Sequence, residues 1–141
     1  MENYMRLEFP SKSQNESFAR TAVAAFATQL DITVDEMADI KTAVSEAVTN
    51  AIVHGYRDTR GVICISAKID GGEIEITVED KGRGIEDVHK AMQPLYTTCA
   101  EDERSGMGFT IMETFMDRLA VTSEMGAGTK VVMTKTIANN S

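Results

Sequence analysis

The sequence lacks several features that would place it in other classes of protein. It contains no tryptophan, two prolines and only two cysteines, Cys64 and Cys99, among its 141 residues. The cysteines form neither a CxxC pair nor a disulfide-framework spacing, so we interpret both as free thiols. No stretch approaches the roughly 18 uninterrupted apolar residues of a membrane span, and no basic and then apolar leader opens the chain. We therefore expect a cytoplasmic protein without a membrane partner.

Positive charge is also scarce, with 14 Lys and Arg against 22 Asp and Glu and a net charge of −8. Direct binding to nucleic acid through a broad cationic surface is therefore not expected. A protein with this net negative charge is better suited to bind a protein partner with a basic surface than to bind nucleic acid. The remaining composition is that of a globular protein, and the length suits one domain, residues 1–141, with 138–141 expected to be a frayed tail.

Apolar residues that alternate with polar ones predict five strands. The predicted strands are residues 5–9, 61–69, 74–80, 119–124 and 129–136. Gly71-Gly72 predicts a hairpin turn between the second and third strands, and Gly126 and Gly128 predict the connection between the last two.

Apolar residues at helical spacing predict two helices in the first half of the chain. The first is expected to begin at a capping box formed by Ser13 and Glu16. The second is expected to begin at a capping box formed by Thr33 and Glu36 and to end near Gly55.

The second half of the chain predicts one further helix, over residues 109–116. Residues 81–108 are expected to be mostly loop, with a short helix around 86–92, and so long a loop usually has a function. Together the elements predict an α+β fold, a two-layer α/β sandwich. Its sheet is mixed and mostly antiparallel, with the helices on one face.

The second helix carries a polar stripe. Glu46, Asn50 and His54 follow one another at intervals of four residues, so they lie together at the border of the apolar face. The amide oxygen of Asn50 is a neutral ligand that suits Mg²⁺, and Glu46 can accept a proton or orient a nucleophile. A solvated helix face would show the same residues, and this alternative stays open.

A carboxylate followed by two glycines ends the third strand. Asp80 can accept a hydrogen bond from an exocyclic amine such as that of adenine. Gly82 and Gly84 allow the backbone to approach a flat ring closely. An ordinary polar turn has the same composition, so the motif alone does not distinguish the two.

A second glycine cluster precedes the last helix. It consists of Ser105, Gly106, Met107, Gly108 and Phe109. Its backbone amides and the helix N-terminus suit phosphate oxygens, and the preceding Thr97, Thr98 and Arg104 suit a lid over a nucleotide. A plain helix-capping loop is the alternative. Neither glycine cluster is a Walker A loop or a Rossmann fingerprint, which argues against those nucleotide folds.

The order of these motifs adds to what each indicates alone. The chain carries, in succession, Glu46-x-x-x-Asn50, Asp80-x-Gly82-x-Gly84, Gly106-x-Gly108 and Gly128-Thr129. This succession resembles the boxes of the GHKL ATPases, which share the Bergerat fold. The resemblance implies ATP as the ligand, with Mg²⁺ coordinated through Asn50, adenine held by Asp80, and Thr129 near the adenine edge. It also adds His54 and Ile85 to the nucleotide-binding residues.

Longer segments resemble a narrower group, the anti-sigma-factor protein-serine kinases. The matching segments are residues 13–20, 45–51, 54–56 and 103–113. The resemblance implies a homodimer that binds the sporulation sigma factor F in its ATP state and phosphorylates a serine of an anti-anti-sigma factor. It places Arg20 on the partner-facing surface and Arg104 in the mobile ATP lid. The second glycine box lacks the third glycine of many sensor kinases, so we expect the lid to grip the triphosphate differently.

In the implied reaction Glu46 is the catalytic residue, which orients or deprotonates the attacking serine hydroxyl. The ATP-binding module accounts for the length of the chain and leaves no room for a second domain that could carry the phosphate acceptor. The acceptor serine is therefore expected in another protein. Two alternatives stay open: an ATP-gated binding module without productive phosphate transfer, and an interaction domain without a ligand. Loss of transfer with retained partner binding in Glu46→Gln would indicate that the two roles are separable.

Overall fold

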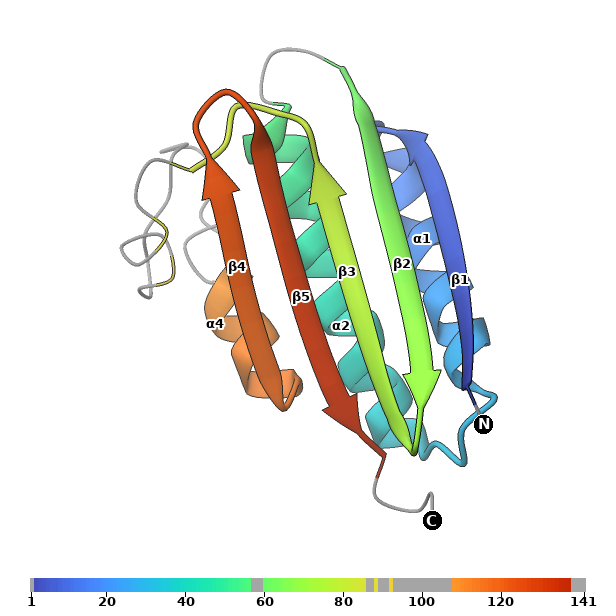
Figure 1. Cartoon of the computed structure of the whole chain (residues 1–141). Helices are drawn as coiled ribbons and strands as arrows, with labels where there is room; N and C mark the ends of the chain where they lie inside the picture. The colour runs from blue at the N-terminus through green and yellow to red at the C-terminus, as the bar shows by residue number, and fades with distance from the viewer. Residues whose placement is uncertain (1, 57–59, 86–87, 89–91, 93–107, 138–141) are drawn as a thin grey trace.

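The computed structural model describes residues 2–56, 60–85, 88, 92 and 108–137 (Figure 1). Five strands form one sheet in the order β1-β2-β3-β5-β4. They are β1 (Glu2–Pro10), β2 (Val62–Asp70), β3 (Glu73–Asp80), β4 (Arg118–Glu124) and β5 (Gly128–Thr136). All five strands predicted from the alternation of apolar residues are confirmed.

Every pairing within the described sheet is antiparallel, whereas the sequence predicts a mixed, mostly antiparallel sheet. The difference follows from the position of β5. Strands β3 and β4 run in the same direction, but β5 lies between them, so they form no parallel pair (Figure 1).

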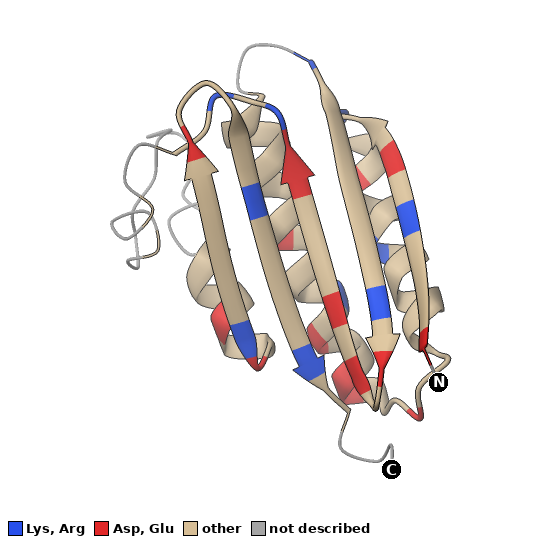
Figure 2. Cartoon of the chain, in the orientation of Figure 1, with Lys and Arg blue, Asp and Glu red and all other residues tan. Residues whose placement is uncertain are grey.

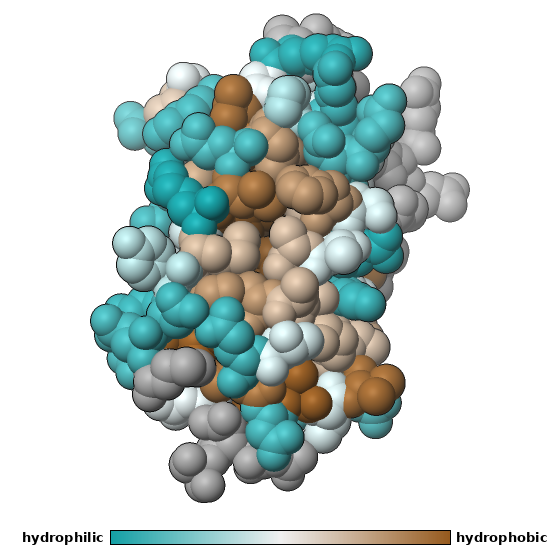
Figure 3. Space-filling view, turned by 90° about the vertical axis from the view of Figure 1, so that its right-hand side faces the viewer, coloured by the Kyte–Doolittle hydropathy of each residue, from teal (hydrophilic) through white to brown (hydrophobic). Residues whose placement is uncertain are grey.

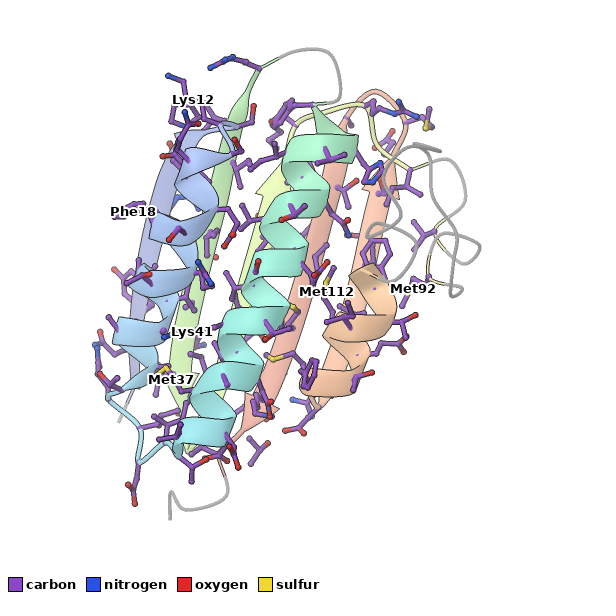
Figure 4. All side chains as sticks on the ribbon, turned by 180° about the vertical axis from the view of Figure 1, so that it is seen from behind. Lys12, Phe18, Met37, Lys41, Met92 and Met112 are labelled. Atoms are coloured by element: carbon purple, nitrogen blue, oxygen red, sulfur yellow. The ribbon has the colours of Figure 1, made fainter. Side chains whose placement is uncertain are left out.

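The described helices all lie on one face of the sheet, which confirms the two-layer α+β sandwich (Figure 1). They are α1 (Gln14–Ala27), α2 (Val34–Asn50), a π-helical turn η1 (Ala51–Gly55) that continues α2, and α4 (Gly108–Phe115). Helix α2 lies between α1 and α4 (Figure 4). None of these helices is long and apolar enough to cross a membrane.

The hydrophobic core lies between the sheet and the helices. Alternate positions of β2 and β3 are fully buried isoleucines, namely Ile63, Ile65, Ile69, Ile74 and Ile76. Helix α2 covers them with Ile40, Val44 and Val48, which are also fully buried. Burial of each such side chain contributes about 1.5–3 kcal/mol to folding. The other face of the sheet carries charged residues such as Lys68 and Glu75 (Figure 2).

The capping box predicted at the start of α2 is confirmed. The Glu36 N–H donates to the Thr33 hydroxyl oxygen at 3.0 Å, and the Thr33 N–H donates to the Glu36 carboxylate at 3.0 Å. Two backbone donors at the helix N-terminus are thereby satisfied, which fixes where α2 begins.

The capping box predicted at the start of α1 is wrong. Ser13 has helical angles (φ −59°, ψ −30°) and its side chain makes no capping hydrogen bond. The reason is that a helical turn already begins before Ser13, because the Asn15 N–H donates to the Lys12 carbonyl at 2.9 Å. The Glu16 carboxylate instead pairs with Arg20 one turn further along, at 3.2 Å.

The glycine turn between β2 and β3 is confirmed. Gly71 and Gly72 have φ values of +59° and +84°, the left-handed pair that a type I′ hairpin turn requires. The short helix predicted around 86–92 falls mostly outside the described residues, although the Met92 N–H donates to the Val88 carbonyl at 3.0 Å, a helical hydrogen bond. The tail 138–141 also lies outside them.

Lys135 of β5 connects three elements. Its ammonium group donates to the Phe115 carbonyl at the end of α4 at 2.9 Å and pairs with Asp39 of α2 at 3.4 Å, with the Lys135 side chain only 11% exposed. Lys135→Met keeps most of the stem but removes the charged donor, so we expect the free energy of unfolding in urea to fall by about 1–3 kcal/mol. Lys130→Met, at an exposed position of the same strand, is the control. An equal loss in both variants would contradict the assigned role.

Candidate nucleotide-binding site

The polar stripe of the second helix ends in a π-helical turn. The predicted helix end near Gly55 is confirmed, but its last turn is π-helical and not α-helical, since the Tyr56 N–H donates to the Ala51 carbonyl five residues back at 3.1 Å. A π-turn takes more residues per turn than an α-helix, so His54 does not continue the spacing that aligns Glu46 with Asn50. Such turns occur frequently at functional sites.

Asn50 and the start of α4 come together at this end of the helical layer. A Cβ atom on Gly108 would lie 3.1 Å from Asn50 Nδ2 and 3.2 Å from Asn50 Oδ1. Glycine at the first position of α4 therefore lets the helix N-terminus approach the Asn50 carboxamide closely. One turn earlier on α2 lies Glu46, which is only 9% exposed. The structure thus places a carboxylate, a carboxamide and a helix N-terminus in one region, as the motifs predict.

These residues suit a magnesium ion bound with a nucleotide. The space that Gly108 leaves beside Asn50 keeps the amide oxygen, a neutral ligand of the kind Mg²⁺ accepts, clear of a side chain. Among the described residues no group of three or more His, Cys, Asp or Glu side chains forms a metal site of its own. Mg²⁺ in nucleotide sites commonly takes phosphate oxygens and waters as its other ligands, so one protein amide fits this arrangement.

Asp80 ends β3 with its side chain on the helix face of the sheet, where it is 7% exposed. The Gly82 N–H donates to its Oδ1 atom at 2.9 Å. Burial raises the pKa of Asp80 above the usual range, and hydrogen bonds from the backbone of Gly82 and Thr129 oppose this shift. A Cβ on Gly55 would lie 2.8 Å from the carboxyl carbon, so the end of η1 closes one side of the carboxylate.

Two glycines let the turn after β3 pack closely against backbone on both of its sides. A Cβ on Gly82 would overlap the Gly55 carbonyl oxygen, and the Arg83 N–H donates to that oxygen at 2.9 Å. Gly84 has a φ of +80°, and a Cβ there would overlap the carbonyl oxygen of Glu124. The two glycines predicted to permit close approach therefore hold the turn between η1 and the β4–β5 connection.

Tyr56 supports the candidate site through contacts that the motifs of the sequence do not indicate. Its ring is buried beside Gly61, and its hydroxyl donates to the Val62 carbonyl at 2.8 Å. The same oxygen accepts from the Lys81 N–H at 2.6 Å. Because Lys81 directly follows Asp80, the tyrosine fixes the backbone that carries the carboxylate. The sequence signals were its position next to Gly55 and its place in the matching segment 54–56.

Tyr56→Phe keeps the ring and removes the hydroxyl. We expect a loss of about 1–2 kcal/mol in the free energy of unfolding, because a part-buried N–H and a part-buried carbonyl lose their partner. We also expect nucleotide affinity, measured by calorimetry, to fall roughly fivefold as Asp80 loses its fixed position. Tyr4→Phe, at a position 78% exposed on β1, is the matched control. Unchanged affinity alongside reduced stability would limit Tyr56 to a structural role.

Thr129 lies directly opposite Asp80 in the β3–β5 register, and Ser123 of β4 lies opposite Thr129 on the other side. The Ser123 and Thr129 hydroxyl oxygens are 2.8 Å apart. The Ile85 N–H donates to the Ser123 hydroxyl at 2.7 Å, which ties the segment after Gly84 to β4. Ser123 was missed in the sequence, since only the strand register shows that it lies beside Thr129.

The remaining predicted site residues fall into three groups. Phe109 is buried in the core, so its side chain packs against the sheet and helices. Arg20 lies on α1, on the opposite side of α2 from α4, and therefore away from the candidate nucleotide site (Figure 4). The lid and phosphate-loop residues lie outside the described residues: Thr97, Thr98, Arg104, Ser105, Gly106 and Met107.

Comparison with known proteins places this geometry in a family. Residues 9–135 match the model of the histidine kinase-like ATPase domain. The anti-sigma F factor of Thermoanaerobacter sp. (strain X514) is 64% identical over 138 residues, 98% of this chain and 96% of that protein. The anti-sigma F factor of Clostridium perfringens (strain SM101 / Type A) is 62% identical over 136 residues, 96% of this chain and 97% of that protein.

Two solved structures share the fold. The blue-light activated histidine kinase of Erythrobacter litoralis EL346 matches 77% of this chain and 32% of its own, with 28% identity and a TM-score of 0.59. The RsbU and RsbW domains of a Mycobacterium tuberculosis protein match 96% of this chain and 32% of their own, with 20% identity and a TM-score of 0.69, a likeness of fold alone. The chain therefore belongs to the histidine kinase-like ATPase family, the GHKL group with the Bergerat fold, in the branch of the anti-sigma F factors.

Proposed function

We propose that the chain is a cytoplasmic protein that binds Mg-ATP at this site and transfers the γ-phosphate to a serine of an anti-anti-sigma factor. In its ATP state it is proposed to bind the sporulation sigma factor F and block its transcriptional activity. The observation that carries the nucleotide part is the close approach of Gly108 to the Asn50 carboxamide. It puts a magnesium ligand beside a helix N-terminus, and both groups suit a triphosphate. The sigma-factor part is supported by 64% identity to a protein named anti-sigma F factor.

The adenine is proposed to lie at the other end of the site, against Asp80 and Thr129. The Asp80 carboxylate accepts from the exocyclic amine through lone pairs that its backbone contacts with Gly82 and Thr129 leave available. Gly82 and Gly84 dock the turn after Asp80 against Gly55 and Glu124 and so hold it in place beside the proposed base, and Ile85 supplies an apolar contact. His54, on the π-turn beside Gly55, completes the proposed nucleotide-binding set of the described residues.

Glu46 is proposed as the catalytic residue. Its carboxylate orients the attacking serine hydroxyl and accepts its proton as the oxygen bonds to the γ-phosphorus and the bond to the β-phosphate oxygen breaks. Mg²⁺, when bound to Asn50, neutralises the charge of the phosphates. The backbone amides at the start of α4 add the positive end of the helix dipole.

The segment that precedes α4 is proposed to close over the triphosphate. Ser105, Gly106 and Met107, which directly precede Gly108, are proposed to contribute backbone amides to the phosphates. The proposed lid residues are Thr97, Thr98 and Arg104. This assignment rests on the resemblance of residues 103–113 to the anti-sigma-factor kinases.

The protein partners are proposed to bind along the edge formed by β1 and α1. An apolar band runs down this edge between hydrophilic borders (Figure 3). Phe18 of α1 is 54% exposed and projects sideways from the helix at this outer edge (Figure 4), and Met5 and Leu7 of β1 are partly buried. Arg20, two residues after Phe18, is proposed to contact the partner. The chain is proposed to act as a homodimer.

Transfer of label from γ-labelled ATP to the anti-anti-sigma factor tests this proposal. The wild type should label one serine in a magnesium-dependent reaction, and Asn50→Ala should abolish labelling. Sigma factor F should bind more tightly in the presence of ATP than of ADP, and Arg20→Ala should weaken that binding. ATP-dependent binding of sigma factor without any labelled partner would instead indicate an ATP-gated binding module.

A further inference from the structure

The hydroxyl group of Ser123 has three hydrogen-bonding neighbours at the end of the sheet that carries Asp80. Its Oγ atom is 2.7 Å from the Ile85 backbone nitrogen, 3.0 Å from the Gly128 carbonyl oxygen and 2.8 Å from the Thr129 hydroxyl oxygen. All four residues are brought together by the β4–β5 register and by the docking of the turn after β3.

The chemistry of these neighbours fixes the direction of every hydrogen bond. A serine hydroxyl has one proton to donate and two lone pairs with which to accept. The Ile85 N–H is a donor and occupies one lone pair, while the Gly128 carbonyl is an acceptor and takes the proton. Only a lone pair is left for Thr129. The Thr129 hydroxyl must therefore donate to Ser123.

The direction of the Thr129 proton has a consequence for the candidate adenine site. With its proton held by Ser123, the Thr129 oxygen can only accept hydrogen bonds from a ligand. Asp80, directly opposite in the register, presents a carboxylate, which is also an acceptor when ionised. The wall formed by the ends of β3 and β5 therefore offers acceptors and no hydroxyl donor.

We propose that Ser123 is a specificity-determining residue of the nucleotide site. By holding the Thr129 proton, it makes the site select purines that carry an amino group at C6 over purines that carry a carbonyl there. This inference rests on the proposed binding of adenine against Asp80 and Thr129. A site whose polar groups can only accept hydrogen bonds disfavours a ligand that presents a further acceptor to them. Two facing acceptors form no hydrogen bond, so both the protein oxygen and the ligand oxygen are left without a donor.

Without the Ser123 hydroxyl the Thr129 hydroxyl is released. In Ser123→Ala it can rotate and donate to a carbonyl, so ligands with an oxygen at C6 gain a partner. In Ser123→Thr the hydroxyl remains, and a β-branched residue is well suited to a strand. A purely structural role of Ser123 predicts weaker binding of all purine nucleotides alike, and no change in the ratio between them.

The test is equilibrium binding of ATP and of inosine triphosphate to the full chain with Mg²⁺; inosine triphosphate has a carbonyl in place of the amino group at C6 and carries a proton on the neighbouring N1. We expect the wild type and Ser123→Thr to prefer ATP similarly, and Ser123→Ala to lower the ratio of the two affinities about tenfold. Ser123→Cys, nearly the same shape with a weakly hydrogen-bonding thiol, should lower it as well if the alanine variant does not fold.

An unchanged affinity ratio in folded Ser123→Ala or Ser123→Cys would overturn the assignment, even if both affinities fall. Failure of the wild type to bind ATP is a different result, since it would overturn the proposed function and this inference with it. The inference is supported if the wild type binds ATP and if the ratio of ATP affinity to inosine triphosphate affinity changes only in the variants that lack the Ser123 hydroxyl.

Discussion

Replacing Glu46 with glutamine should lower the rate of phosphate transfer by a factor of about 10²–10⁴ while ATP binding persists. Glutamine has nearly the same shape as glutamate, so the packing of this buried side chain on α2 is retained. An amide cannot take up the proton of the attacking serine hydroxyl, so only the chemical step loses its base. The rate is measured with a saturating concentration of the anti-anti-sigma factor, and ATP affinity is measured separately by calorimetry.

Glu75→Gln is the matched control for this substitution. Glu75 lies in the middle of β3 on the face of the sheet that the helices leave open, where it is exposed. The control variant should transfer phosphate at the wild-type rate. Undiminished transfer in Glu46→Gln would remove Glu46 from the catalytic role, whereas loss of ATP binding would indicate that the side chain holds the nucleotide.

Replacing Asp80 with asparagine should weaken ATP binding by roughly 100-fold, because a charged acceptor is lost and an amide donor can face the adenine amine. The same variant should be at least as stable as the wild type at pH 7. Burial raises the pKa of Asp80, so its ionised form costs folding free energy, which the neutral amide avoids. Calorimetric binding and thermal unfolding measure the two effects.

The raised pKa of Asp80 also predicts the pH dependence of both effects. The stabilisation from a protonated Asp80 is fully present below the unfolded-state pKa of about 3.9 and is lost as the pH rises through the higher folded-state pKa. The stability advantage of Asp80→Asn should therefore appear across this interval and stay constant above it. Wild-type affinity for ATP should fall as the pH is lowered through the folded-state pKa.

Asp70→Asn, at an exposed position at the end of β2, is the control for Asp80→Asn. Its affinity for ATP should equal that of the wild type at every pH, including the fall at low pH. An asparagine variant of Asp80 that binds ATP as tightly as the wild type would exclude Asp80 from recognition of the base. A variant that is clearly less stable at pH 7 would show that its backbone hydrogen bonds outweigh the cost of burial.

The strands and helices could be predicted because each signal is local. The isoleucines of β2 and β3 alternate regularly, Gly71 and Gly72 suit a tight turn, and the capping box at Thr33 needs only residues within one helical turn. The capping pattern at Ser13 is equally local, but it failed because the turn that begins at Lys12 already places Ser13 within helical backbone.

The site was only partly predictable because several of its contacts depend on tertiary structure. Asn50 and Asp80 were recognisable as residue types that suit a nucleotide. The π-turn after Asn50 has no distinctive sequence, and the roles of Tyr56 and Ser123 come from hydrogen bonds to distant segments. Such contacts follow from strand register and from the docking of the turn after β3, which no local pattern encodes.

A crystal structure of the chain with Mg²⁺ and a non-hydrolysable ATP analogue tests the central claim most directly. We expect the adenine amino group to lie within hydrogen-bond distance of the Asp80 carboxylate. We also expect the metal to contact the Asn50 amide oxygen and the phosphates to face the N-terminus of α4. An analogue bound elsewhere, or bound here with its base away from Asp80, would contradict the proposed site.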